Sequence, residues 1–256
     1  MIRFIPILLI SFFLLTSCHK DSDDDIVLTD ITLNFSHSWN DTSITNSDFN
    51  DIKFTNAKGD LLSIERLRYL ISKITFHKSD GSTLVLEGYN LVDLTNNENL
   101  SFTPITKIPL DSYSDVTFTF GFNNEDNIDG AYNDLNAASW NVPTMLGGGY
   151  HYMQFDGKFI NSINEAQGFN YHVIRAADNA GDNPTFPQDT FFTVSLGATT
   201  ITNNTAFNVE MNIAEWFKNP NTWDLNVLNQ MLMPNSAAQI MMFENGQNVF
   251  SLKPIE

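Results

Sequence analysis

The chain has 256 residues, which suits one large all-β domain or two ordinary domains. Hydrophobic residues make up 42% of it, 21 Phe among them, so a packed core is expected and disorder is excluded. Thirteen Lys and Arg against 30 Asp and Glu give a net charge of −17, which repels phosphates and excludes nucleic acid as a partner. A single cysteine excludes an internal disulfide and a zinc site built from several thiolates.

Residues 1–17 have the features of a secretory signal peptide. Arg3 provides the positive charge, and the apolar run from Ile5 to Leu15 is too short to remain as a membrane span. The run ends in Leu15-Thr16-Ser17-Cys18, which resembles the lipobox of a bacterial lipoprotein. We therefore expect cleavage before Cys18 and acyl chains on this residue, which would anchor the protein in the cell envelope, at the outer membrane, facing the periplasm or the outside.

The stretch His19–Asp25 is polar and mostly acidic, so residues 18–26 are predicted to form a solvated tether. The acidity resembles the export signal of some surface lipoproteins, and a plain acidic linker is the alternative. Residues 1–25 contain two basic and four acidic side chains, a net charge of −2, which leaves −15 for the remainder. No break in composition divides residues 27–256, so we expect them to form one domain.

Period-two alternation of apolar and polar residues dominates that domain and predicts strands with one buried face. Residues that alternate in this way or form short apolar runs are Ile31–Phe35, Tyr69–His77, Leu84–Asp93, Val116–Phe122, Tyr150–Phe159, Phe169–Ile174, Phe191–Leu196 and Phe207–Ile213. The segments between them are rich in Asn, Asp, Gly and Pro, as in surface loops.

Helix signals are few. Ser63–Arg66 could form a single turn, and Ser236 with Gln239 reads as a capping box that opens a helix to Asn245, stopped by Gly246. The predicted fold class is therefore all-β: an antiparallel β-sandwich with long loops and one or two short helices.

The sequence has neither a serine-nucleophile motif nor a phosphate-binding glycine loop, so we do not expect an enzyme. The histidines do not have a zinc-protease spacing, and a metal site would have to be assembled from distant strands. The acidic loop Asn124–Gly130 offers oxygen ligands for calcium but does not match the register of a calcium-binding loop.

Several segments together resemble the MbnP-like copper-binding proteins. They begin with Leu61–Ile74, Asp80-Gly81 and Tyr89–Asp93, and continue in family order with Val116–Phe122, Trp140, Gly149–Gly157 and Phe169–Val173. The resemblance covers most of the chain after residue 30. It implies a β-rich periplasmic or surface protein that binds copper through histidines and an oxidised tryptophan, kynurenine.

By this resemblance, His37 and Trp39 fall where the family places its first histidine and its modifiable tryptophan, and His172 falls on the family's Tyr-His motif. His151 is a weaker candidate ligand. Phe35 stands where copper-binding relatives can have a second histidine. Neutral imidazoles suit copper in either oxidation state, and an acidic surface concentrates cations.

Four methionines, Met231, Met233, Met241 and Met242, could add thioether ligands for cuprous ion, although core packing is the better interpretation of them. Trp140 and Tyr150 are expected to be architectural.

The leading functional hypothesis is a lipid-anchored copper-binding protein that handles metal, with the copper ion and the membrane as its partners and no protein partner specified. The alternative is a surface sandwich that binds glycans or other macromolecules without a metal. Trp223, in an Asn-rich segment, would then be an exposed platform for sugar stacking.

Overall fold

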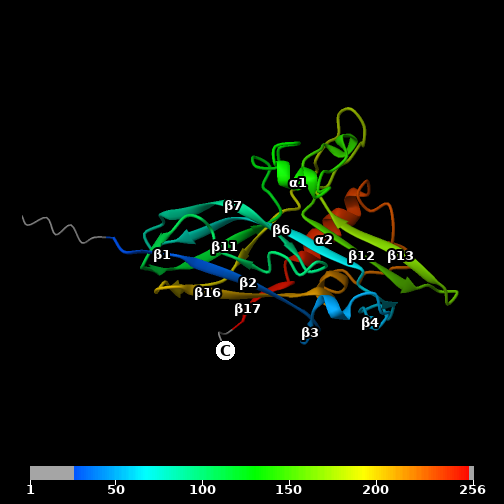
Figure 1. Cartoon of the computed structure of the whole chain (residues 1–256). Coiled ribbons are helices and arrows are strands. Elements are labelled where there is room, and N and C mark those ends of the chain that lie inside the picture. Colours follow the sequence, from blue (N-terminus) through cyan, green and yellow to red (C-terminus); the bar gives the residue numbers. More distant parts are fainter. Residues whose placement is uncertain (1–25, 254–256) are drawn as a thin grey trace, which may run out of the picture.

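The computed structural model describes residues 26–253. The predicted signal peptide, Cys18 and nearly all of the tether therefore lie outside the described residues. The fold is an all-β sandwich, as predicted, drawn out along its strands, with the short strand β1 (Leu28–Thr29) at one end and a long hairpin at the other (Figure 1).

The larger sheet has eight strands and is built around β6, which pairs with β7 along one edge and with β11 and then β12 along the other. The hairpin partner of β12 is β13, and all of these pairings are antiparallel. The strands of this sheet are β4 (Phe54–Thr55), β5 (Leu61–Leu62), β6 (Arg66–His77), β7 (Thr83–Asp93), β11 (Asp115–Phe120), β12 (Met153–Ile160), β13 (Ala166–Val173) and β14 (Phe192–Ser195).

The second sheet has five strands, and it differs from the predicted antiparallel arrangement in one pair of strands. Strands β2 and β16 run parallel, with Ile31 opposite Thr205 and Ser38 opposite Asn212. Because these strands come from the two ends of the domain, their pairing joins its beginning to its end. The strands are β2 (Ile31–Trp39), β3 (Thr42–Ile44), β8 (Ser101–Phe102), β16 (Thr205–Asn212) and β17 (Phe250–Lys253). Two small ladders, β1 with β9 (Ile108–Pro109) and β10 (Ser112–Tyr113) with β15 (Thr199–Thr200), complete the strands.

Aromatic side chains fill the space between the two sheets. Phe35 on β2 lies edge-on to Tyr69 on β6, with ring centroids 6.1 Å apart, and Phe250 on β17 lies 5.8 Å from Phe120 on β11. Contacts of this kind add about 0.5–1.5 kcal/mol each to the free energy gained by burying apolar area. Trp140 and Tyr150, expected to be architectural, are also fully buried.

The helices are short and lie beside the sandwich (Figure 1). They are α1 (Asn133–Ala137) and α2 (Ser236–Gly246), with 3-10 turns η1 (Asn46–Asp48), η2 (Thr144–Leu146) and η3 (Ile213–Phe217). Helix α2 ends at the predicted glycine. Its cap is Asn235 rather than Ser236, because the Asn235 side chain accepts a hydrogen bond of 3.1 Å from the amide of Ala238.

Three sequence-based expectations were wrong. Ser63–Arg66 is not a helical turn, because the amide of Ser63 donates to the carbonyl of Lys158 at 2.7 Å and so continues the sheet. Trp223 is fully buried, not exposed: its ring lies 4.6 Å from that of Tyr171 and its Nε1–H donates to Leu228 at 2.8 Å. Met231 is not packed in the core but is 78% exposed, in a loop. Met242 is buried in the core, as expected.

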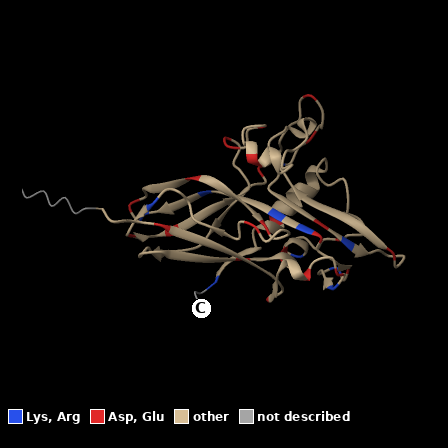
Figure 2. Cartoon of the chain, viewed as in Figure 1, with Lys and Arg blue, Asp and Glu red and all other residues tan. Residues whose placement is uncertain are grey.

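Charged side chains are sparse, and acidic ones predominate (Figure 2). Within residues 26–253 no helix is long and apolar enough to cross a bilayer.

Candidate metal site

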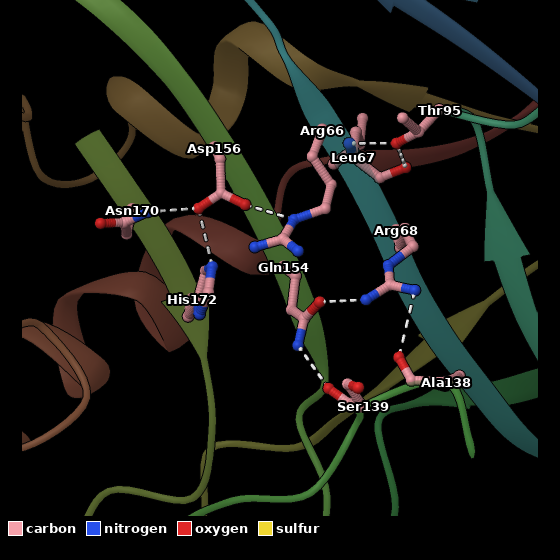
Figure 3. A network of polar contacts seen from close by, with 10 residues as sticks. All are labelled: Arg66, Leu67, Arg68, Thr95, Ala138, Ser139, Gln154, Asp156, Asn170 and His172. Atoms are coloured by element: carbon pink, nitrogen blue, oxygen red, sulfur yellow. Dashed lines mark hydrogen bonds and ion pairs between the residues drawn. The ribbon is translucent and has the colours of Figure 1, made fainter. Parts of the chain in front are cut away.

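Three neighbouring strands of the large sheet, β6, β12 and β13, place polar side chains together (Figure 3). The alternate residues Met153 and Phe155 lie in the core, so the polar face points away from the sandwich interior. In the register, Asp156 on β12 lies between Arg66 on β6 and Asn170 on β13. One pair further along, Gln154 lies between Arg68 and His172. Alternate residues of a strand share a face, so all six side chains project to the same side.

Asp156 is the centre of this polar network. Its Oδ1 accepts hydrogen bonds from Asn170 Nδ2 at 2.6 Å and from His172 Nε2 at 2.8 Å, and its Oδ2 accepts one from the guanidinium of Arg66. Burial raises the pKa of the carboxyl group, but the hydrogen bonds from His172, Asn170 and Arg66 outweigh burial and lower the pKa to about 2. Asp156 is therefore a carboxylate at neutral pH.

The contact with Asp156 determines which nitrogen of His172 can bind a metal. A carboxylate accepts hydrogen bonds and cannot donate them, so the ring proton is on Nε2. In the neutral ring the lone pair is then on Nδ1. A carboxylate that orients a ligating imidazole through its second nitrogen is a common arrangement around protein-bound metals.

His151 has the complementary arrangement. Its Nδ1 lies 2.8 Å from the carbonyl oxygen of Trp140, which can only accept, so the proton is on Nδ1 and the lone pair on Nε2. Burial lowers the pKa of His151 to about 4, so the ring is neutral at physiological pH. Within residues 26–253, Nε2 is buried without any hydrogen-bond partner. A buried lone pair of this kind costs free energy unless a ligand uses it.

The two imidazoles are neighbours, with ring centroids 5.3 Å apart. Metal–nitrogen bonds are about 2 Å long, which puts each ring centroid roughly 3 Å from a bound ion and two ligating rings about 5 to 6 Å apart. The observed separation therefore fits two imidazoles that share one ion. Across the described part of the chain no group of three or more His, Cys, Asp and Glu side chains could hold a metal, so other ligand types would have to complete the site.

The acidic loop Asn124–Gly130 supports the backbone beside His151. Asn127 Oδ1 accepts a hydrogen bond of 2.8 Å from the amide of Tyr150, and Asp129 Oδ1 accepts one of 3.2 Å from the amide of Gly149. These oxygens stabilise the turn that precedes His151.

His37 and Trp39, the other two predicted ligands, lie elsewhere. His37 is buried in the sandwich interior, where its Nε2 is 3.1 Å from the hydroxyl of Tyr69. Tyr69 pairs with Met153, and His172 pairs with the next residue, Gln154, so Tyr69 and His172 point to opposite faces of the sheet. The sheet thus separates His37 from His172, and the two cannot share an ion.

Trp39 packs against Phe54 and Phe217, at centroid distances of 5.0 and 5.9 Å, and its Nε1 donates to the carbonyl of Thr55 at 3.2 Å. It therefore belongs to the core beside β4 and η3. The structure brings together His151 and His172 and leaves His37 and Trp39 apart from them.

Arg66, Arg68, Gln154 and Asp156 belong to the site although no sequence motif indicates them as functional residues. The signal for them was present in the alternation of β12, where polar residues at 154, 156 and 158 oppose apolar residues at 153, 155 and 159. Polar residues at two successive positions on the same face of a strand, next to a histidine on the neighbouring strand, indicate a hydrogen-bond network rather than a solvated surface.

An all-β sandwich with two neighbouring histidines beside its large sheet defines the class of this protein as a β-sandwich with a candidate metal site. The sequence profile of the family MbnP matches residues 29–241, more than half of the chain, and the protein belongs to that family.

The structure of MbnP from Methylosinus trichosporium has the same fold, with a TM-score of 0.53 and 11% sequence identity over 78% of this chain and 81% of that one. At this identity the likeness shows the fold alone. No curated protein matches the sequence significantly.

Proposed function

We propose that this protein is an extracytoplasmic, lipid-anchored member of its family that binds copper and acts in metal handling, not in catalysis. The observation that carries the proposal is the pair of imidazoles, each with one nitrogen fixed by an oxygen acceptor and the other left with its lone pair. Neutral imidazole is a good ligand for copper. The ion is the cargo of the protein, and the residues that hold it are His151 and His172.

The site needs little rearrangement to bind. Both rings are already oriented through their other nitrogen, and the carboxylate of Asp156 places a negative charge beside His172. Since His151 is neutral at physiological pH, no proton has to leave before its Nε2 can coordinate the ion.

Copper titration of the full-length protein, purified in detergent and stripped of metal, tests this function. We expect one equivalent to bind to the wild type, and much weaker binding after His151→Ala or His172→Ala. His77→Ala is the matched control, because His77 lies on β6 with its Nε2 3.1 Å from the hydroxyl of Thr117, away from the network. Copper binding that survives both site substitutions would refute the assignment.

The alternative is a surface sandwich that binds glycans or other macromolecules without a metal, and it loses one of its two supports because Trp223 is buried. The other support, Phe35 in place of a second histidine, remains.

A further inference from the structure

A cavity of about 500 Å³ opens beside His172. Three methionines line it, Met145, Met231 and Met233, together with Leu and Pro side chains. The remaining lining residues, His172 and Asn170, both belong to the network around Asp156. The wall of this cavity thus combines an imidazole with three thioethers.

The methionines come from two segments that the fold fixes next to His172. Gln239 on α2 is fully buried, and its Nε2 donates both to the carbonyl of His172, at 2.9 Å, and to the carbonyl of Leu232, at 3.0 Å. One amide therefore joins the end of β13 to the loop that carries Met231 and Met233.

The third methionine, Met145, lies on η2. Met233 packs against the small apolar cluster that contains Leu146, the neighbour of Met145 in the sequence. This apolar contact joins the turn that carries Met145 to the loop that carries Met231 and Met233.

Packing in the core does not account for Met145 and Met231. Met231 is 78% exposed and Met145 is 56% exposed, although the core could bury apolar residues of this size. Met231 also has a φ of +56°, a conformation that L-residues with side chains adopt at a cost of about 1–3 kcal/mol and that clusters at ligand sites. A large apolar side chain held exposed and strained beside a metal-binding imidazole points to a ligand for its sulfur.

We propose that Met145, Met231 and Met233 complete the candidate site and make it selective for a soft monovalent ion, Cu(I), for which Ag(I) is the redox-inert analogue. This inference rests on the proposed copper-binding function and specifies the oxidation state of its cargo. Thioethers prefer Cu(I) to Cu(II), and they add no charge to the site.

The neighbouring cations support the same choice. Arg66 is bound to the carboxylate of Asp156, and Arg68 lies over the ring of Trp140, 5.0 Å from its centroid, with its other contacts to neutral groups. Positive charge this close to His151 and His172 penalises a divalent ion more than a monovalent one.

The test is a comparison of Ag(I), Cu(I) and Cu(II) binding by the full-length protein in detergent. Ag(I) is titrated calorimetrically, and Cu(I) against a competing chelator. The triple variant Met145→Leu, Met231→Leu, Met233→Leu keeps the size and apolar character of each side chain but removes its sulfur. We expect it to bind Ag(I) and Cu(I) at least about 100-fold more weakly and Cu(II) almost as before. X-ray absorption of the Cu(I)-loaded wild type should show sulfur ligands that the variant lacks.

Met241→Leu on α2 is the matched control, since that side chain packs against the core, and its Ag(I) affinity should not change. The exposed Met231→Leu substitution alone should weaken Ag(I) binding about tenfold without affecting folding. Cys18 is common to all of these proteins and cannot cause the difference.

The outcomes separate the two proposals. A wild type that binds no copper of either oxidation state overturns the proposed function. If the wild type and the triple variant bind Cu(I) equally tightly, the proposed function stands and the role of the methionines is overturned.

Discussion

The buried histidines determine how the stability of this protein depends on pH. Burial lowers the pKa of both His37 and His151 from 6.5 to about 4. Between pH 4 and 6.5 these two histidines bind protons in the unfolded chain but not in the folded one. They therefore do not reduce the free energy of unfolding above about pH 6.5, and they reduce it progressively as the pH drops toward 4. A shift of this size is worth on the order of 3 kcal/mol for each group.

Denaturant unfolding between pH 4.5 and 7 measures this dependence. His37→Gln replaces the titrating ring with a neutral amide that can still reach the Tyr69 hydroxyl, so the slope of unfolding free energy against pH should fall to about half. An unchanged slope in this variant would show that His37 is not the group responsible.

The ligands of the candidate metal site could be predicted only in part from the sequence. His151 and His172 were both recognisable as candidates, but so were His37 and Trp39, because a residue's type and its motif do not state which face of a strand it occupies. The decisive facts are contacts across the fold: Nδ1 of His151 against the carbonyl of Trp140, and Nε2 of His172 against Asp156. The first depends on the bridge between Asn141 and Tyr150, and the second on the register of β12 and β13.

Gly157 allows β12 to lie very close to the backbone at Ser63. A Cβ at this position would lie 2.0 Å from the carbonyl oxygen of Ser63 and 2.7 Å from the ring of Phe169. Since the first of these atoms is backbone, the strand itself would have to move. Gly157→Ala should therefore destabilise the protein by about 2 kcal/mol or more, measured by chemical unfolding.

Gly168 provides the control on the neighbouring strand. It lies on β13, where an added Cβ would meet nothing closer than 3.9 Å. Gly168→Ala should leave the stability nearly unchanged, and equal losses for the two variants would contradict this account of Gly157.

Elements were predictable where one face of a strand is buried. The alternation in Phe207–Ile213 gave β16 to within two residues at its start, because the inner positions meet the core and the outer ones meet solvent. Pairing partners were not predictable in this way. The parallel contact of β2 with β16 depends on residues about 170 positions apart, and the extended path at Ser63 depends on the carbonyl of Lys158.

Charge affects how the whole molecule can associate with a membrane. Of the net charge of −17, all but −2 belongs to residues 26–256, so an anionic bilayer surface repels the folded domain. Within the described residues no helix could span a bilayer. Acyl chains at Cys18 are the proposed anchor, and at least two chains would be needed for stable retention at a membrane.

Cys18→Ser tests this dependence, because serine has no thiol for the acyl-glyceryl group. We expect the wild type to incorporate labelled palmitate and to lose residues 1–17, and the variant to do neither. Ser17→Gly keeps a small residue before the cysteine and should be processed like the wild type. Labelling of Cys18→Ser would place the acyl chains elsewhere, and an unlabelled wild type that partitions into the aqueous phase of a detergent extract would exclude the anchor. The anchor would leave Cys18 without a free thiol, so a soft ion held by the folded domain would have to be bound by imidazole and thioether groups.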